Sequence, residues 1–322
     1  MTSVVRVGVI GTGFGGRVIA PTFAATGGCE VVDLVSARDD GAVATLCRRA
    51  DVDLVSIHSP PFLHARHVRL ALASGRAVLC DKPFGLCAGD SAALLAEAEA
   101  AGVVHLVNFE FRYDPARRQM RDWIREGLIG PVEHVTWTHL SSGSRVPLRR
   151  FGWLFERSAG GGWIGAWGSH AVDTLRFVLD AEVTSARATL ATTIPERPDH
   201  EGVLRRCDAE DGITATLNMS GGATVAVDSG FAAPVSLPPR LVVIGSHGAI
   251  ENIADRRLVL RGVDGGRDER RFDDRPDRHV GPMAAWAEIV RDAVRQHIAP
   301  PDAPTFADGL ACDRALDQLR AG

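Results

Sequence analysis

Short apolar runs alternate with amphipathic blocks over the first 110 residues of the chain. The apolar runs are rich in Val, Ile and Leu and are bounded by glycine, proline or charged residues, a pattern typical of buried strands. The blocks between them have helical spacing, and the last one begins at Asp90 or Ser91 and ends before Gly102. The pattern predicts strands at 4–10, 30–36, 52–58, 76–81 and 103–109 and helices near 14–26, 40–49, 63–74 and 90–101. Such alternation is typical of an α/β doubly wound parallel sheet with crossover helices.

One interval in this pattern is short. Only 16 residues lie between Ser36 and Asp53, whereas a helix, a strand and a second helix would need about 30 residues. A single helix near 40–49 fits there. We therefore predict that one strand–helix unit is missing and that strand 30–36 lies at an edge of the sheet.

From about residue 114 the pattern changes to strand-like runs separated by turn residues, which predicts an α+β domain built on an open, mostly antiparallel sheet. Asp114 and Pro115 open a helix that is expected to reach Glu126 and to stop at Gly127. The expected strands are 132–140, 183–194, 213–218, 223–231, 240–245 and 257–262, and further helices are expected at 169–179, 281–297 and 306–320.

Two later segments, 195–211 and 261–279, are charged and rich in proline and glycine, and we predict that they are solvated loops. The chain is expected to form two domains, residues 1–113 and 114–322, with the terminal helix packing back on the first domain.

Composition changes this picture little. The 322 residues are 45% hydrophobic and 24% charged, which is typical of globular proteins. The net charge of −4 argues against broad binding to nucleic acid or to an anionic membrane. No signal-peptide layout and no apolar run of about 18 residues is present. The six scattered cysteines form no C-x-x-C pair, which favours free thiols and a cytoplasmic location.

A glycine cluster follows the first strand and opens the first helix. This context suits a dinucleotide-binding G-x-G-x-x-G motif, in which Gly11 allows a sharp turn, Gly13 lets the backbone approach a pyrophosphate, and Gly16 lets helix and strand pack closely. A simple strand–helix corner is the alternative. The predicted phosphate-binding residues are Gly11, Thr12, Gly13, Phe14, Gly15 and Gly16.

The end of the second strand bears on the choice of cofactor. NAD-binding domains usually place an acid there for the ribose hydroxyls, but this chain has Ser36 and Arg38. A hydroxyl and a guanidinium suit a 2′-phosphate, so we predict NADP(H) in preference to NAD(H). The alternative is an exposed loop arginine beside Asp39 and Asp40. The missing strand–helix unit would leave the adenosine end of the pocket more open than usual.

The third and fourth strands also end in residues that suit the ligand crevice of a parallel sheet. Ser59 and Pro60 are expected to shape a wall for the cofactor ribose, with His64 nearby. The spacing of the three histidines at 58, 64 and 67 matches no common ligand set, so no metal is predicted. Lys82, between Asp81 and Pro83, is placed to donate a proton to a substrate oxygen; the alternative is a surface lysine in a turn.

A glycine-rich segment, Gly160–Ser169, precedes another candidate, His170. The small residues would let a ligand or another backbone approach, and they place His170 in the first turn of the predicted helix 169–179. Histidine is the residue best able to exchange a proton near neutral pH. Asp173, three positions later, is placed to orient it or to cap the helix. A purely structural histidine is the alternative.

Together these motifs resemble the glucose–fructose oxidoreductase/inositol dehydrogenase/MocA (Gfo/Idh/MocA) family. The likeness spans most of the chain, and the ordered series is more specific than any one motif. The matching segments are Gly11/Gly13/Gly16, Ser59-Pro60-Pro61, Asp81-Lys82-Pro83, Asn108–Pro115, Gly160–Asp173 and Pro304–Leu319.

The resemblance implies an N-terminal Rossmann domain, a C-terminal domain whose open sheet often forms dimers or tetramers, and NAD(P)-dependent redox chemistry on sugars or cyclitols. By this likeness Lys82 and His170 would be the catalytic acid/base pair, and Asp81 would lie at the cofactor. The implied substrate-contacting residues are Glu110, Arg112, Trp153, Trp167 and Asp173. The family's aspartate four residues before the histidine is Ala166 here, and Glu110 is a candidate replacement.

The leading hypothesis is therefore an NADP(H)-dependent oxidoreductase that moves a hydride between nicotinamide and a carbonyl or secondary alcohol of a small polar substrate. Two alternatives stay open. One is a tightly held nicotinamide used for transient oxidation, as in the family's glycosidase branch. The other is a ligand sensor or assembly subunit that kept the fold and lost the chemistry, which Ala166 and the short first domain would suit.

Overall fold

The computed structural model describes residues 4–273 and 277–322, and they divide into two compact units. The first unit comprises residues 1–113 and 276–314, and the second comprises residues 114–275 and 315–322. This division differs from the expected range 114–322 for the second domain. The reason is packing: the fully buried Trp286 stacks on Tyr113, with 5.0 Å between ring centroids, within the core around the first strand.

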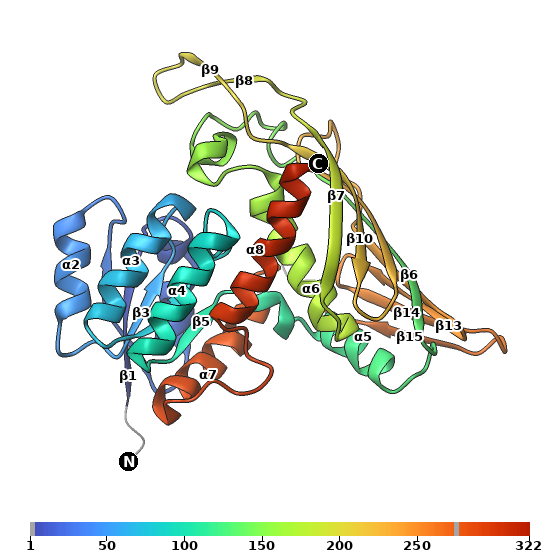
Figure 1. Cartoon of the computed structure of the whole chain (residues 1–322), viewed down its shortest axis with the longest axis horizontal. Helices are drawn as coiled ribbons and strands as arrows, with labels where there is room; N and C mark the ends of the chain where they lie inside the picture. Colours follow the sequence, from blue (N-terminus) through green and yellow to red (C-terminus); the bar gives the residue numbers. More distant parts are fainter. Residues whose placement is uncertain (1–3, 274–276) are drawn as a thin grey trace. The chain divides into compact units, whose positions relative to one another are not determined.

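The first unit is built on a five-stranded parallel sheet with helices on both faces (Figure 1). Its strands are β1 (Val5–Ile10), β2 (Cys29–Val35), β3 (Leu54–Ile57), β4 (Ala77–Cys80) and β5 (His105–Val107). Its helices are α1 (Ala20–Ala25), α2 (Asp40–Arg48), α3 (Pro61–Ala73), α4 (Ala88–Ala101) and α7 (Val280–Gln296). A π-helical turn, Gly15–Ile19, leads into α1. The predicted parallel α/β architecture is confirmed.

The strand order is β2-β1-β3-β4-β5, so β2 lies at the edge of the sheet. Only α2 connects β2 to β3, and every residue of that connection is described. The predicted loss of one strand–helix unit is thereby confirmed. Ser36 and Arg38, which follow this edge strand, are exposed. The predicted open adenosine pocket requires such exposure.

Helix α4 begins earlier than predicted. Its first residue is Ala88, not Asp90 or Ser91. Ser91 is fully buried and donates a 2.6 Å hydrogen bond from its hydroxyl to Asp313 Oδ2, so it does not cap the helix. The other end agrees with the prediction, because Gly102 adopts the left-handed conformation that ends many helices.

The second unit contains an eight-stranded, mostly antiparallel sheet packed against α5 (Pro115–Arg125) and α6 (Ser169–Leu179) (Figure 1). Only the β6–β11 pairing is parallel among the strand pairs described for this sheet. Asp114 caps α5 as predicted, accepting hydrogen bonds from the backbone N–H groups of Ala116 and Arg117. The strands in order across the sheet are β15 (Arg267–Arg271), β14 (Arg257–Gly262), β13 (Gly248–Ile253), β12 (Arg240–Gly245), β6 (Val132–Leu140), β11 (Thr224–Gly230), β10 (Gly212–Met219) and β7 (Val183–Ala191).

The two segments predicted as loops contain strands, so that prediction was wrong in part. Segment 195–211 holds the hairpin β8 (Glu196–Pro198) and β9 (Leu204–Arg206), and segment 261–279 holds the edge strand β15. Strand β13 was not predicted either. These strands lack apolar alternation because ion pairs take its place: Glu269 of β15, for example, lies 2.9 Å from both Arg257 and Arg267.

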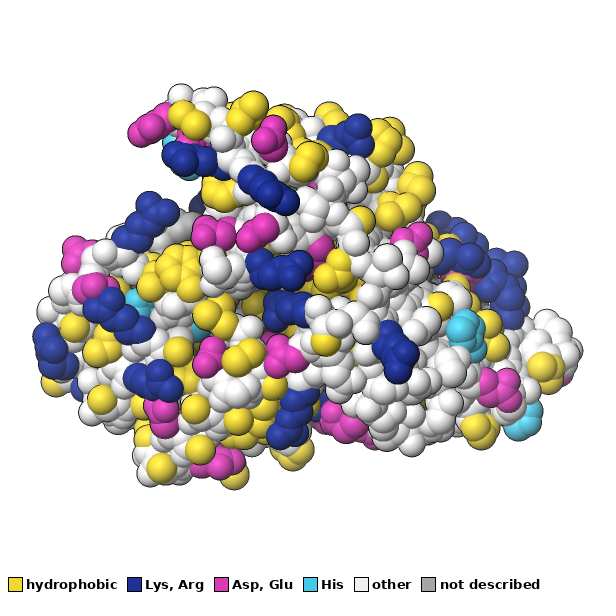
Figure 2. Space-filling model, turned by 45° about the horizontal axis from the view of Figure 1, so that its top comes forward, with side chains coloured by type: hydrophobic (Ala, Val, Ile, Leu, Met, Phe, Trp, Pro, Cys, Tyr) yellow, Lys and Arg dark blue, Asp and Glu magenta, His cyan; other side chains and the backbone are white. Residues whose placement is uncertain are grey.

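The last helix, α8 (Phe306–Ala321), ends the chain. The surface face drawn in Figure 2 shows arginine and acidic side chains interspersed, in keeping with the small net charge. The six cysteines are free, as predicted. Within residues 4–273 and 277–322, no helix combines the length and hydrophobicity that spanning a bilayer requires.

Candidate active site

The glycine loop after β1 has the backbone geometry that the fingerprint requires. Gly11 has a φ of +115°, and a Cβ atom there would lie 2.4 Å from the carbonyl oxygen of His58. A Cβ atom on Gly16 would lie 3.3 Å from Leu34 of the neighbouring strand, which explains close helix–strand packing. Gly11 and Gly16 therefore serve the fold of this loop.

Gly13 differs from these two glycines because nothing described lies within 4 Å of the position that its Cβ would occupy. Thr12 and Gly13 are both exposed. The adjoining helical segment begins at Gly15, and the first turn of a helix carries N–H groups without intrahelical acceptors. Space for a ligand at Gly13, next to such N–H groups, fits the pyrophosphate of a dinucleotide, which Gly11–Gly16 would hold.

The residues after β2 lie open to solvent. Ser36 and Arg38 are exposed, and the Arg38 backbone N–H donates a 3.3 Å hydrogen bond to the Ser36 hydroxyl. The two acids that follow are engaged elsewhere. Asp39 caps α2 by accepting a hydrogen bond from the Ala42 N–H, and Asp40 lies 2.7 Å from Arg66.

Three polar side chains meet at the carboxyl ends of β3, β4 and β5. Asp81 accepts a 2.8 Å hydrogen bond from Asn108 Nδ2, and its other oxygen lies 3.2 Å from His58 Nδ1. His58 Nε2 in turn lies 2.7 Å from the buried hydroxyl of Ser56. Burial alone would raise the pKa of Asp81, but His58, Lys82 and the Asn108 hydrogen bond outweigh it and lower that pKa. Asp81 is therefore an anion at neutral pH.

His64 lies beneath this edge and is 1% exposed. Its Nε2 lies 2.8 Å from the carbonyl oxygen of Ser59, and its Nδ1 lies 3.0 Å from that of Pro83. Burial lowers the pKa of His64, and the ring lies between the turn after β3 and the turn that carries Lys82. His67 Nδ1 lies 3.0 Å from the Ser59 hydroxyl. Ser59 and His64 thus contact each other and neighbouring protein groups at this edge of the sheet.

Lys82 is the second residue after β4 and is half-buried. It is the only lysine in the chain. Burial lowers its pKa, while the nearby carboxylates of Asp81 and Glu110 oppose that shift. A lysine in this environment can lose and regain its proton more readily than an exposed lysine can.

Glu110 and Arg112 lie in the 3-10 turn Glu110–Tyr113 after β5, and both side chains are buried. Arg112 donates a 2.8 Å hydrogen bond to Asp308 Oδ1. Glu110 Oε1 lies 2.7 Å from His279 Nδ1. Sequence reasoning missed His279, because it lies at the end of a segment predicted to be a solvated loop.

In the second unit, α6 (Ser169–Leu179) has the bounds predicted from the sequence, with His170 in its first turn. A π-helical turn, Ile164–Gly168, which was not predicted, runs into α6, and Gly168 itself has helical φ and ψ angles. His170 is 6% exposed.

Two glycines before this helical segment make room for protein groups: Gly161 for the backbone of Trp153 and Glu156, and Gly162 for Glu210. A Cβ atom on Gly162, which has a φ of +101°, would lie 2.2 Å from Glu210 Oε1. That oxygen accepts a 2.9 Å hydrogen bond from the Ile164 N–H, and the Glu210 carbonyl oxygen accepts one from the Trp163 N–H. Glu210 caps the helical segment, a role that the sequence did not predict because the two segments are almost 50 residues apart.

The predicted substrate residues of the second unit differ in exposure. Trp167 is 5% exposed and packs edge-on against Trp137 and His139, with centroid distances of 5.1 and 5.3 Å. Asp173 is 2% exposed and lies one turn after His170, with Arg176 4.0 Å away. Trp153 is 38% exposed. His170 and Asp173 thus share α6, as expected, and Trp167 lies in the π-helical turn before it.

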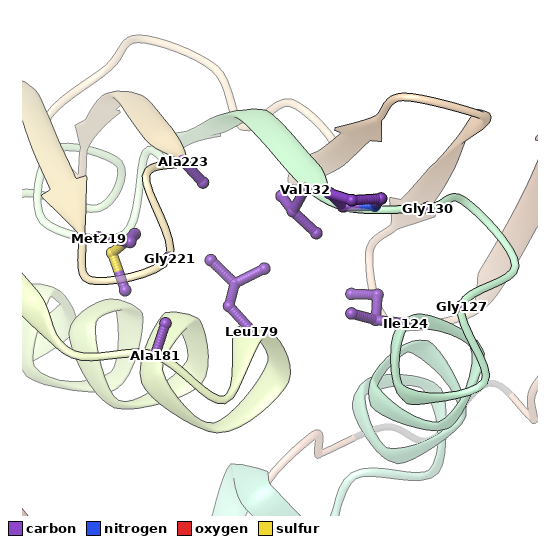
Figure 3. Close-up of a pocket in the computed structure, with 10 residues that line it drawn as sticks. Ile124, Gly127, Gly130, Val132, Leu179, Ala181, Met219, Gly221 and Ala223 are labelled. Atoms are coloured by element: carbon purple, nitrogen blue, oxygen red, sulfur yellow. The ribbon is translucent and has the colours of Figure 1, made fainter.

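A separate apolar pocket lies in the second unit, between the ends of α5 and α6 and the start of β6 (Figure 3). Ile124, Leu179 and Met219 point into it. None of the predicted site residues lines it. Within the described ranges no three His, Cys, Asp or Glu side chains converge as a metal site would require.

Comparison with known protein families gives two matches. Residues 5–109 match an oxidoreductase family described as having an NAD-binding Rossmann fold. Residues 117–251 match the GFO/IDH/MocA C-terminal domain. The two matches are adjacent and together account for most of the chain.

Two relatives and one solved structure are similar to this chain. Levoglucosan dehydrogenase from Pseudarthrobacter phenanthrenivorans is 30% identical over 193 residues, which are 56% of this chain and 49% of that protein. The chain thus spans about half the length of that relative. Inositol 2-dehydrogenase from Rhizobium meliloti is 28% identical over 95% of this chain and 93% of its own length. A solved levoglucosan dehydrogenase, in complex with NADH and levoglucosan, superposes with a TM-score of 0.87 at 23% identity, covering 99% of this chain and 97% of that one. At that identity the superposition establishes the fold.

Proposed function

Because this chain belongs to the GFO/IDH/MocA family of oxidoreductases with an NAD-binding Rossmann domain, we propose that it transfers a hydride between a nicotinamide cofactor and a carbonyl or secondary alcohol of a sugar or cyclitol. The family expected from the sequence motifs is confirmed. The activity, the cofactor preference and the substrate class are proposals.

One observation carries the proposal more than any other, namely the identity of residue 82. The chain has 36 basic residues, Lys and Arg together, and Lys82 is the only lysine among them. Arginine stays protonated in proteins and cannot act as a proton donor and acceptor, whereas a lysine with a lowered pKa can. A half-buried amine at the carboxyl end of β4, in a sheet whose first loop has open space at Gly13, suits the proton transfer that must accompany hydride transfer.

The bound nicotinamide would supply or accept the hydride at its C4 atom. In oxidation, the neutral amine of Lys82 takes the proton of the substrate hydroxyl; in reduction, its ammonium form returns a proton to the carbonyl oxygen. Asp81 favours the ammonium form, and Asn108 and His58 hold Asp81 in place. We propose His170 as the second proton-exchanging group, with Asp173 one turn away on the same helix.

For the cofactor we propose NADP(H) over NAD(H). The support is the exposed pair Ser36 and Arg38 at the end of the edge strand, with the neighbouring acids Asp39 and Asp40 engaged elsewhere. A guanidinium and a hydroxyl suit a 2′-phosphate and give the 2′-hydroxyl of NAD no carboxylate partner.

For the substrate we propose a small polyhydroxylated molecule such as a sugar, anhydrosugar or cyclitol. Among the relatives, one is named for levoglucosan and another for inositol. In this chain the buried carboxylate of Glu110 and the exposed Trp153 supply, respectively, a hydrogen-bond acceptor and an aromatic surface, both of which suit hydroxyl-rich rings.

The test combines binding with turnover. Ligands that bind the folded state raise the melting temperature, so NADPH should raise it more than NADH at equal concentration. Turnover is then followed by absorbance of the reduced nicotinamide, with a panel of anhydrosugars, cyclitols and aldoses. No melting shift with either cofactor would contradict the proposal.

A second candidate function is binding of a nicotinamide without net turnover. Ala166, where the family has an aspartate, is the observation that favours it. It predicts a melting shift with NADPH but no change in nicotinamide absorbance with any substrate of the panel, and it predicts that Ala166→Asp restores measurable turnover.

A further inference from the structure

Glu110 is a buried carboxylate next to the turn that carries Lys82. Its side chain is 2% exposed, and its Oε1 lies 2.7 Å from His279 Nδ1. Its Oε2 is buried and has no hydrogen-bond partner in the part of the chain that the structure describes. Burying a carboxylate oxygen without a hydrogen bond costs free energy, so the position of this oxygen points to a functional reason for it.

Lys82 and Glu110 follow neighbouring strands of the sheet, so their backbones run side by side. The Asn108 N–H donates a 2.7 Å hydrogen bond to the Cys80 carbonyl oxygen, and the Asn108 side chain binds Asp81. Glu110 comes two residues after Asn108. The Glu110 carboxylate is one of two anions that oppose the lowering of the Lys82 pKa by burial.

His279 links Glu110 to solvent. It is the residue before α7, and its side chain is 29% exposed. Its ring packs edge-on against Phe14, with a centroid distance of 5.5 Å, and lies tilted against Phe111, with a centroid distance of 5.1 Å. Phe14 belongs to the glycine loop, so the imidazole is held between the proposed cofactor loop and the turn that carries Glu110.

We propose that Glu110 and His279 form a proton path between Lys82 and solvent. The inference depends on the role of Lys82 proposed above. One proton moves at a time: from Lys82 Nζ to the Glu110 carboxylate, from Glu110 to the His279 imidazole, and from the imidazolium to water. No electrons move, and each group returns to its starting charge. The reverse sequence reloads Lys82 when the reaction consumes a proton.

Charged groups surround the Lys82 end of this path. Lys82 is acted on by the anions of Asp81 and Glu110, by the cation of Arg278 and by Cys312. Asp81 is held by His58 and Asn108, and it stabilises the ammonium form of Lys82. His279 is the exposed end of the series. Because a bound substrate would cover the half-buried lysine, a route through the protein would let Lys82 exchange its proton without opening the site.

The single lysine makes the path directly observable. Protein grown with 15N-labelled lysine has one side-chain ammonium signal, that of Lys82, and its rate of exchange with water is measurable by NMR on the unliganded protein. We expect Glu110→Gln and His279→Gln each to slow this exchange severalfold, and the double variant to slow it no further, because the two residues act in series. Lys82→Arg confirms the assignment by removing the signal.

The matched control is His297→Asn, which changes a histidine at the other end of the same helix, α7, and should leave the exchange rate unchanged. Unchanged exchange in His279→Gln would overturn the proposal. So would slower exchange in Glu110→Gln alone, because Glu110 would then act only as a charge. His279 is partly exposed, so its variant should fold even where the change at the buried Glu110 is not tolerated; melting curves check both.

This measurement uses neither cofactor nor substrate. A chain that shows slowed exchange in both variants but no turnover with any substrate would retain the proton path and lose the proposed function. Turnover in a chain whose two variants leave the exchange rate unchanged would support the proposed function and contradict the proton path.

Discussion

A 2.8 Å hydrogen bond joins Asn108 Nδ2 to Asp81 Oδ1 across the ends of β5 and β4, and it holds a carboxylate beside the only lysine of the chain. That carboxylate opposes the effect of burial on Lys82. The protonation of Lys82 should therefore depend on Asp81.

Replacing Asp81 with Asn should lower the pKa of Lys82 further, because the change removes an anion that stabilises the ammonium form. Reductive methylation with 13C-formaldehyde labels only Lys82 and the N-terminal amine, so an NMR titration reports the lysine directly. Asp40→Asn, at an exposed acid, is the control. An unchanged or raised lysine pKa in Asp81→Asn would show that the carboxylate does not act on Lys82 as described.

Two glycines of the same loop should respond in opposite ways to substitution. Gly11→Ala should destabilise the protein by roughly 1–3 kcal/mol, because the residue has a positive φ and its Cβ would meet the His58 carbonyl. Gly13→Ala should fold with an unchanged melting temperature, since its Cβ has free space, but should lose the melting shift caused by NADPH. A retained shift in Gly13→Ala would mean that no pyrophosphate lies against this loop.

Arg38 should control the choice between the two nicotinamide cofactors. Arg38→Ala is expected to weaken NADPH binding roughly tenfold or more, the effect of losing a charge-assisted hydrogen bond, and to leave NADH binding unchanged. Isothermal titration measures both affinities. Arg48→Ala, at an exposed arginine at the end of α2, is the control. Equal weakening of both cofactors, or tighter binding of NADH by the unmodified protein, would contradict the proposed preference.

Stability should fall as the pH decreases from about 6.5 to about 4, in part because of His67. Burial lowers the pKa of this residue from 6.5 to about 4, so the folded state holds the neutral ring. A group of this kind stabilises the protein above pH 6.5, and that contribution, on the order of 2–3 kcal/mol, is lost as the pH falls toward 4. The pKa values of His64 and His105 are lowered in the same direction.

The check is urea unfolding at pH 7.5 and at pH 5. His67→Gln should lose less stability between these two values than the unmodified protein loses. His200→Gln, at an exposed histidine, should behave like the unmodified protein. The same pH dependence in all three proteins would contradict the assignment.

The fold was largely predictable from local patterns. Buried parallel strands such as β3 are continuous apolar runs, and helices such as α5 carry their own caps, so both can be identified without tertiary information. The misses have a common cause. Strand β15 is charged and is held by ion pairs from Glu269 to arginines of its own strand and of β14, and such pairings leave no hydrophobic period in the sequence.

The candidate site was predictable where chemistry follows a strand end, as with Lys82 and Asp81. It was not predictable where contacts join segments far apart in the chain. His279 reaches Glu110 across 169 residues, and Glu210 caps a helix 46 residues before it. His64 illustrates a third limit: it lies near the expected cofactor wall, yet both its ring nitrogens contact backbone carbonyls.

The most direct test of the proposed activity is a comparison of Lys82→Arg with the unmodified protein, in which NADPH affinity and turnover are measured on the same samples. Arginine keeps the positive charge but cannot release its proton. We expect NADPH affinity within about threefold of the unmodified value, and turnover reduced by about 10²-fold or more, the usual contribution of a general acid–base group. Equal turnover in the two proteins would contradict the account.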